Sequence, residues 1–300
     1  MKVVFSFQKD NSSKPQRQNI TFEAGLTSKI MQEIQQADVL EISSRLAKKG
    51  IPTDFKGNQV VAWCCDKTVG IFEQLNKEFG TKLALPKGIF VENFERLNIN
   101  NPTIAGFCNP LRSSNLIKGS NIQVNGETLF FNTFEALKGK HSIHQHWLYD
   151  WTNIDSVADY NYSQGSVATD HFLDVFMHEF FHVAHEDRLL HKIGEGNLER
   201  NIDEAKTVVG IENYRRKYGL KISKICNHAL SSPLEAIACD TSRTVASHLD
   251  EETLVLRQNP FIGTPYERLS LWKRINIPYY TDEQRPLTEI LRNFWNGKFD

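Results

Sequence analysis

The spacing of apolar residues along the chain predicts several helices that end at glycine. Residues 26–49 carry apolar side chains at helical intervals and are followed by Gly50, with Pro52 just beyond it. The longest amphipathic segment, residues 169–192, runs into a glycine-rich stretch. The remaining helices are predicted at residues 69–79, 201–218, 233–249, 265–274 and 286–295.

Strand signals are shorter and lie in the first half of the chain. Residues 3–7 and 59–64 are compact apolar runs. Residues 122–131 contain two further runs around Asn125-Gly126, a pair that suits the turn of a β-hairpin because both turn positions need a positive φ. The pattern therefore predicts a small sheet formed early in the chain.

The order of these elements favours an α+β fold over alternating βα units. Strands concentrate before residue 135 and helices after residue 169, and no linker-like stretch separates the two parts. We expect a single domain over residues 1–300, whose first lobe, at about 1–192, holds a small mixed or antiparallel sheet and the amphipathic helix. The second lobe, at about 193–300, is expected to be mostly helical.

Composition and charge argue against several classes of protein. Apolar residues make up 40% of the 300, so the chain can build a core and is not disordered throughout. The 35 basic and 36 acidic residues leave a net charge of −1, so no nucleic-acid partner is expected. No apolar run approaches the ~20 residues that a membrane span needs.

The N-terminus and the cysteines bear on where the protein works. The first apolar run is too short for the core of a signal peptide, and no small-residue cleavage site follows it. Five cysteines, an odd number without paired spacing, are typical of free thiols in a reducing compartment. We expect a cytoplasmic protein, or one that is exported like an effector without a cleavable signal peptide.

Histidines cluster in one short part of the chain. Eight of the ten lie between His141 and His191, and residues 178–182 read HEFFH. On a helical projection, one face is strongly apolar and the opposite face is polar. The polar face carries His171, His178, His182 and His185. An ordinary solvated face is the alternative, but such a face usually carries lysine and arginine, and neither occurs here before Arg188.

The HEFFH segment has the spacing of a zinc site. A zinc ion needs two imidazoles about one helical turn apart, and His178 and His182 are four residues apart. Glu179 is offset by about 100° from the first histidine. It can therefore act on a metal-bound water without binding the metal itself.

A zinc site of this kind needs a third protein ligand. In one branch of HExxH enzymes a histidine ten residues after the first supplies it, but Arg188 stands there. Glu235 is the better candidate, because Ala236 and Ala238 beside it would let its helix approach closely. The alternative is that Glu235 only completes a capping box with Ser232.

The HEFFH motif followed by EAIACD on a later predicted helix resembles the zincin metallopeptidases, and among them the gluzincin branch. The resemblance covers these two helices. It implies a zincin-like fold in which His178, His182 and Glu235 bind one zinc ion. It also implies that Glu179 is the general base in the hydrolysis of a protein or peptide substrate.

Residues around this set are candidates for supporting roles. The family's aspartate that orients a zinc-binding histidine usually lies four residues after the ligand glutamate, whereas here that position is Cys239 and Asp240 comes one residue late. His185 is expected in the cleft, supporting the ligands or taking part in a second metal site. Candidates for stabilising the transition state are Arg243, His248, Tyr266, Tyr279 and Tyr280.

Two other functions stay open on the sequence alone. A non-peptidase zinc hydrolase, similar to a deformylase, would take a cysteine as its third ligand, and Cys108 is the upstream candidate. An inactive module that keeps the fold in order to bind a protein partner would be consistent with the displaced Asp240.

Overall fold

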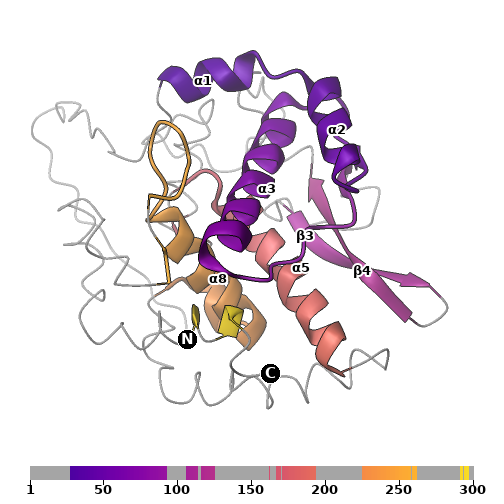
Figure 1. Ribbon diagram of the computed structural model, residues 1–300, viewed down its shortest axis with the longest axis vertical. Coiled ribbons are helices and arrows are strands. Elements are labelled where there is room, and N and C mark those ends of the chain that lie inside the picture. Colours follow the sequence, from indigo (N-terminus) through magenta and orange to yellow (C-terminus); the bar gives the residue numbers. More distant parts are fainter. Residues whose placement is uncertain are drawn as a thin grey trace, which may run out of the picture.

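The computed structural model describes the chain in several stretches. These are residues 28–92, 106–113, 116–125, 162, 167–169, 171–193, 225–257, 259–261, 291–292 and 294–296. Four predicted elements lie outside the described residues: the strand at 3–7, the second hairpin arm at 128–131, and the helices at 201–218 and 265–274. Figure 1 shows how the described elements are arranged.

The first predicted helix is two helices, α1 (Ser28–Gln35) and α2 (Val39–Lys48). Asp38 stands at the break, since its carboxylate accepts two backbone N–H groups of the first turn of α2 at 2.8 and 3.1 Å. Bonding of a side chain to the local backbone competes with a continuous helix. The predicted stop is confirmed, because Gly50 follows α2 with a φ of 78°.

The predicted strand at residues 59–64 is wrong. These residues begin a long helix, α3 (Gln59–Phe79), that also takes in the helix predicted at 69–79. Asn58 caps its start through a hydrogen bond of 3.0 Å, and Gly80 ends it with a φ of 69°. The run VVAWCC is buried along its whole length. A helix buried on all sides has a continuous apolar run, which periodicity alone does not distinguish from a strand.

The strands form one mixed sheet in the order β1-β2-β4-β3. They are β1 (Thr53–Asp54), β2 (Ile89–Glu92), β3 (Gly106–Ser113) and β4 (Leu116–Asn125). β1 and β4 run parallel to β2, and α3 lies in the crossover from β1 to β2. The predicted strand at 122–124 is part of β4, but its antiparallel partner is the preceding strand β3.

The amphipathic helix, α5 (Asp174–Ile193), starts later than residue 169. Before it the chain turns: Nδ1 of His171 accepts the backbone N–H of Leu173 at 3.1 Å, and the carbonyl of His171 accepts the N–H of Asp174 at 2.9 Å. His171 therefore precedes the helix and does not belong to its polar face, which corrects the helical projection.

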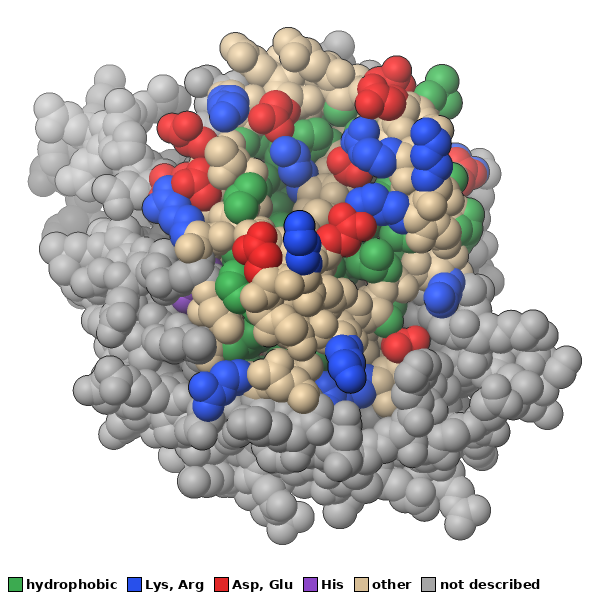
Figure 2. All heavy atoms as spheres, viewed as in Figure 1, with side chains coloured by type: hydrophobic (Ala, Val, Ile, Leu, Met, Phe, Trp, Pro, Cys, Tyr) green, Lys and Arg blue, Asp and Glu red, His purple; other side chains and the backbone are tan. Residues whose placement is uncertain are grey.

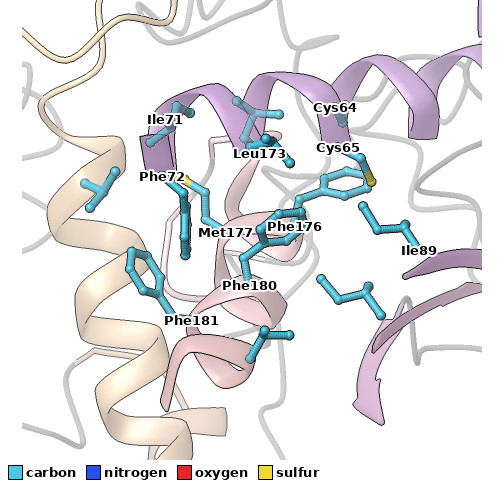
Figure 3. Packing of buried hydrophobic residues seen from close by; sticks show 14 of the residues in the cluster. Cys64, Cys65, Ile71, Phe72, Ile89, Leu173, Phe176, Met177, Phe180 and Phe181 are labelled. Carbon is cyan, nitrogen blue, oxygen red and sulfur yellow. The ribbon is translucent and has the colours of Figure 1, made fainter. Parts of the chain in front are cut away.

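The apolar face of α5 packs against α3 and the sheet. Figure 3 shows Phe180 and Phe181 of α5 in the layer beneath α3, near Phe72. The ring centroid of Phe72 lies 5.4 Å from that of Phe180 and 4.7 Å from that of Phe181. Each of these side chains is fully buried, which contributes about 1.5–3 kcal/mol of hydrophobic free energy. This core holds α5 in place.

A second helix, α8 (Pro233–Ala246), packs against α5 on another side (Figure 1). It ends three residues before the predicted end at 249 and is preceded by a short 3-10 helix, η1 (His228–Leu230). Nε1 of Trp295 donates a hydrogen bond of 3.0 Å to Oγ1 of Thr241, which ties the C-terminal residues to α8. α5 is thus held between an apolar layer and α8.

The face of the molecule over α1, α2 and α3 carries interleaved basic and acidic side chains (Figure 2). Arg45 pairs with Asp66 at 2.8 Å, and Lys49 pairs with Glu73 at 2.6 Å. Such exposed pairs contribute at most about 1 kcal/mol each. Among the helices of the described residues, none has the length and apolar character to cross a membrane.

Candidate metal centre

Two histidines of α5 face each other one turn apart. His178 and His182 have ring centroids 4.6 Å apart, and their Nε2 atoms lie 3.0 Å from one another. Both side chains are largely buried, with 11% and 14% exposed. The i, i+4 spacing of a helix places them together, and the buried apolar face of α5 on the other side fixes the direction in which they point.

α8 brings Glu235 to these histidines. Oγ of Ser232 caps the helix by accepting the backbone N–H of Glu235 at 3.2 Å, while Oε2 of Glu235 lies 3.0 Å from Nε2 of both His178 and His182. The cap and the contact with the histidines are therefore compatible, because they use different atoms of Glu235. The following residue, Ala236, is buried and small enough for close packing of the helices.

The three donor atoms form a triangle with sides of 3.0 Å, made by Nε2 of His178, Nε2 of His182 and Oε2 of Glu235. A tetrahedral zinc ion with ligands at about 2.0–2.1 Å has neighbouring ligands about 3.3 Å apart. Two imidazoles and one carboxylate are also a ligand set that zinc takes in catalytic sites. The chemistry and the spacing of these residues thus fit a zinc ion.

Hydrogen bonds between the imidazoles and the carboxylate hold these side chains together when no ion is bound. Burial raises the pKa of Glu235, but hydrogen bonds from His178, His182 and His228 outweigh burial and bring the pKa well below its usual range. Burial lowers the pKa of His182, whereas the hydrogen bond and the charge of Glu235 raise it, to about 9 in balance. Zinc would have to displace these protons, so its binding becomes weaker as the pH falls.

Glu179 is half-buried and follows His178 on α5. It is not part of the triangle, although its negative charge helps to raise the pKa of His182. Its carboxylate makes no hydrogen bond and no ion pair with the other described residues. A carboxylate beside a metal position but not engaged by other groups is available for proton transfer.

His228, on η1, is a residue of this site that the sequence analysis missed. Its Nε2 lies 3.0 Å from Oε2 of Glu235, and 46% of its side chain is exposed. Among the described residues, the potential ligand atoms that all lie within 4.8 Å of one another belong to His178, His182 and Glu235, and His228 is not one of this group. Its position seven residues before Glu235, next to the turn that caps α8, was the signal available in the sequence.

The other ring nitrogen of His178 meets a thiol. Sγ of Cys239 lies 3.6 Å from Nδ1 of His178. Asp240, the sequence candidate for orienting a ligand, instead forms a buried ion pair with Arg243. Successive residues of a helix point about 100° apart, so Asp240 cannot share the direction of Cys239.

Asp174, one turn before His178, is another buried carboxylate at this helix contact. Its Oδ1 accepts a hydrogen bond of 2.6 Å from Ser242 on α8, and its Oδ2 accepts the backbone N–H of Ala168 at 3.1 Å. Burial raises the pKa of Asp174 to about 6, although these hydrogen bonds act in the opposite direction. Asp174 therefore links the start of α5 to α8.

The remaining site candidates do not join the triangle. His185 is buried against Phe294 and Trp295, with ring centroids 4.9 and 6.3 Å away, rather than lining a cleft. Nδ1 of His248 lies 2.8 Å from the carbonyl oxygen of Thr244, so this nitrogen serves the end of its own helix. Tyr266, Tyr279 and Tyr280 lie outside the described residues.

No known family model matches the chain, and neither the curated proteins nor the solved structures contain a match. The zincin-like fold and the gluzincin resemblance therefore stay predictions.

Proposed function

We propose that the protein is a zinc-dependent metallopeptidase with an α+β, zincin-like fold. His178, His182 and Glu235 would hold one zinc ion, and Glu179 would be the general base. The observation that carries the proposal is the triangle of two imidazole nitrogens and one carboxylate oxygen with 3.0 Å sides, with a half-buried glutamate next to it in the chain. An ordinary polar helix face has no reason to gather these groups from two helices.

A zinc ion bound here would supply Lewis acidity and lower the pKa of a coordinated water toward ~7. The protein's own residues would do the rest. Glu179 would accept the proton of the attacking water and return it to the leaving amine. His228 would donate a hydrogen bond from its other ring nitrogen, Nδ1, to the oxygen that becomes negatively charged, because its Nε2 is already 3.0 Å from Oε2 of Glu235 and its side chain is 46% exposed.

The substrate of the proposed enzyme is a protein or peptide. The histidines are 11% and 14% exposed, Glu235 is 24% exposed and His228 is 46% exposed, so exposure increases toward η1. This gradient favours entry of the substrate from the side of η1.

Glu235 at the third corner also means that a deformylase-like site, with Cys108 as its third ligand, is not required.

A second candidate is a zinc-binding module without catalytic activity. The observation in its favour is that Nε2 of His228 is as close to Glu235 as the two histidines of α5 are, at 3.0 Å. Four protein ligands would close the coordination shell, as in structural zinc sites. Because His228 lies outside the mutually close donors, we favour the site with three ligands.

The proposal is tested by metal analysis and hydrolysis of a peptide library with Glu179→Gln and His178→Ala. We expect one zinc per wild-type chain, retained zinc but at least a hundredfold slower cleavage for Glu179→Gln, and loss of zinc for His178→Ala. Glu186→Gln is the matched control, because Glu186 is a half-buried glutamate of the same helix, and it should cleave like the wild type.

Two results would overturn this function. A wild-type protein without stoichiometric zinc has no metal-dependent activity to explain. Cleavage by Glu179→Gln at the wild-type rate would remove the general base. His228→Ala separates the two candidates: retained zinc with slower cleavage supports the peptidase, whereas loss of zinc in the absence of any cleavage supports the structural module.

A further inference from the structure

Two cysteines contact each other next to His178, one of the candidate metal ligands. Cys226 precedes η1 and Cys239 lies on α8, and their Sγ atoms are 3.5 Å apart as free thiols. Cys226 is 5% exposed and Cys239 is 1% exposed. Neither has a role in the proposed chemistry, yet Cys239 contacts a histidine of the triangle.

A metal ion bound to Nε2 of His178 would determine which of its ring nitrogens carries the proton. Nε2 of His178 faces Glu235, so this atom would bind the metal through its lone pair. In a neutral imidazole the other nitrogen, Nδ1, then carries the hydrogen. Nδ1 lies 3.6 Å from Sγ of Cys239, a length that suits an N–H···S hydrogen bond in which the sulfur accepts. Burial of Cys239 keeps water from competing for this proton.

Cys239 is itself held by Cys226. The Cys226 thiol donates to Sγ of Cys239, and Sγ of Cys226 accepts the backbone N–H of Ala229 at 3.4 Å. The sulfur atoms thus connect α5, α8 and η1, which carry the candidate ligands and His228. A metal-binding histidine generally donates its second N–H to an acceptor that sets the orientation of the ring, and loss of that acceptor weakens metal binding 10–100-fold.

We propose that Cys239 is the positioning residue of His178, with Cys226 fixing the orientation of the Cys239 thiol. This proposal rests on the proposed metal site. It assigns to sulfur a role that carboxylates and carbonyl oxygens usually fill, and it gives the two buried cysteines a function in metal affinity rather than in packing alone.

The test measures zinc affinity by competition with a chelating dye in four variants. Cys239→Val keeps a buried apolar side chain, one methyl group larger, and removes the acceptor, so zinc should bind 10–100-fold more weakly. Cys239→Ser and Cys239→Asp restore an acceptor and should bind within about threefold of the wild type. Cys64→Val, at another fully buried cysteine on α3, is the matched control and should leave the affinity unchanged.

A second readout is the ring of His178 in ¹⁵N NMR spectra of the zinc-loaded protein. We expect the Nδ1–H form in the wild type, and a Nδ1 resonance in Cys239→Val that shifts because its hydrogen bond is lost. If Cys239 had a purely structural role, the stability of all three Cys239 variants would change. Their zinc affinities would then not depend on whether the new side chain is a hydrogen-bond acceptor.

The outcomes separate this proposal from the proposed function. Equal zinc affinities of wild type and Cys239→Val overturn the positioning role, even if the enzyme is active. Zinc binding that depends on the acceptor at position 239, in a protein that hydrolyses no peptide, supports the positioning role and overturns the peptidase. A wild-type protein that binds no zinc overturns both.

Discussion

The two sides of α5 differ in nearly every physical respect. Toward α3 the helix presents Phe180 and Phe181, which are fully buried beside the ring of Phe72. Toward α8 it presents His178, His182 and Asp174, which meet a carboxylate, a thiol and a hydroxyl. Apolar packing is not directional, whereas each polar contact depends on a particular atom.

This difference indicates a division of labour within one helix. The apolar side supplies the free energy that keeps α5 in place, and the polar side uses that fixed position for chemistry. Groups at a metal site must be held within a fraction of an ångström, and a rigid helix provides this better than a loop. Substitutions on the two sides should therefore change different measurable quantities.

The largest expected effect is on metal binding from the polar side. His182→Ala removes one corner of the triangle, so stoichiometric zinc binding should be lost, as measured by metal analysis after dialysis. Because His182 belongs to no apolar cluster, the variant should remain folded by circular dichroism. A variant that retains one zinc per chain would contradict the division between the two sides.

The next largest effect is on stability from the apolar side. Phe180→Ala leaves a cavity against Phe72 and should lower the free energy of unfolding by about 3–5 kcal/mol in urea titrations. The Phe180→Ala molecules that remain folded should still bind one zinc per chain. If Phe180→Ala lost zinc while keeping its stability, the apolar side would have a role in the site.

His185 tests where the boundary between the sides runs. Burial, followed by the charges of His182 and Arg188, lowers the pKa of His185 to about 3. Because this value is below that of the unfolded chain, the protonation of His185 costs no stability above about pH 6.5, and stability is lost as the pH falls from there toward 3. The gain in stability of His185→Leu over the wild type should be about 2 kcal/mol larger at pH 5 than at pH 7, measured on metal-free protein.

That variant should also keep its zinc, since His185 contacts Phe294 and Trp295 and not the triangle. A pH-independent difference between wild type and His185→Leu would show that His185 binds a proton in the folded protein as readily as in the unfolded chain, which contradicts its burial in an aromatic pocket.

The smallest expected effect concerns the N-terminus of α8. Ser232→Ala removes the cap whose hydroxyl accepts the N–H of Glu235, and should cost about 1 kcal/mol together with a severalfold loss of zinc affinity. Ser247→Ala, at the opposite end of the helix, is the control and should leave zinc affinity unchanged. Equal effects of the two substitutions would mean that the cap does not position Glu235.

Some parts of the fold followed from the sequence because their causes are local. Gly50 and Gly80 were expected to end helices, and both have positive φ after a helix. The errors arose where context decides. The run at residues 59–64 looked like a strand but forms the first turns of a helix, which are buried continuously from Val60 to Cys65. The start of α5 is delayed by turn hydrogen bonds of His171.

The candidate site shows the same limit. The spacing of His178 and His182 was readable, and Glu235 was named from its motif, but its alternative reading as a capping residue could not be dismissed. The structure has both the Ser232 cap and the carboxylate at the histidines. His228 carried no comparable motif, because a residue on a short 3-10 helix has no period that predicts its direction.

By itself, the sequence determined that two imidazoles stand one turn apart opposite an apolar face, since helix geometry depends only on neighbouring residues. Only the tertiary structure decided what meets them. His228, Glu235 and Cys239 lie 50–61 residues beyond His178 in the chain, and they reach it because α8 packs against α5. Contacts between distant segments depend on how whole surfaces fit together, which no local pattern encodes.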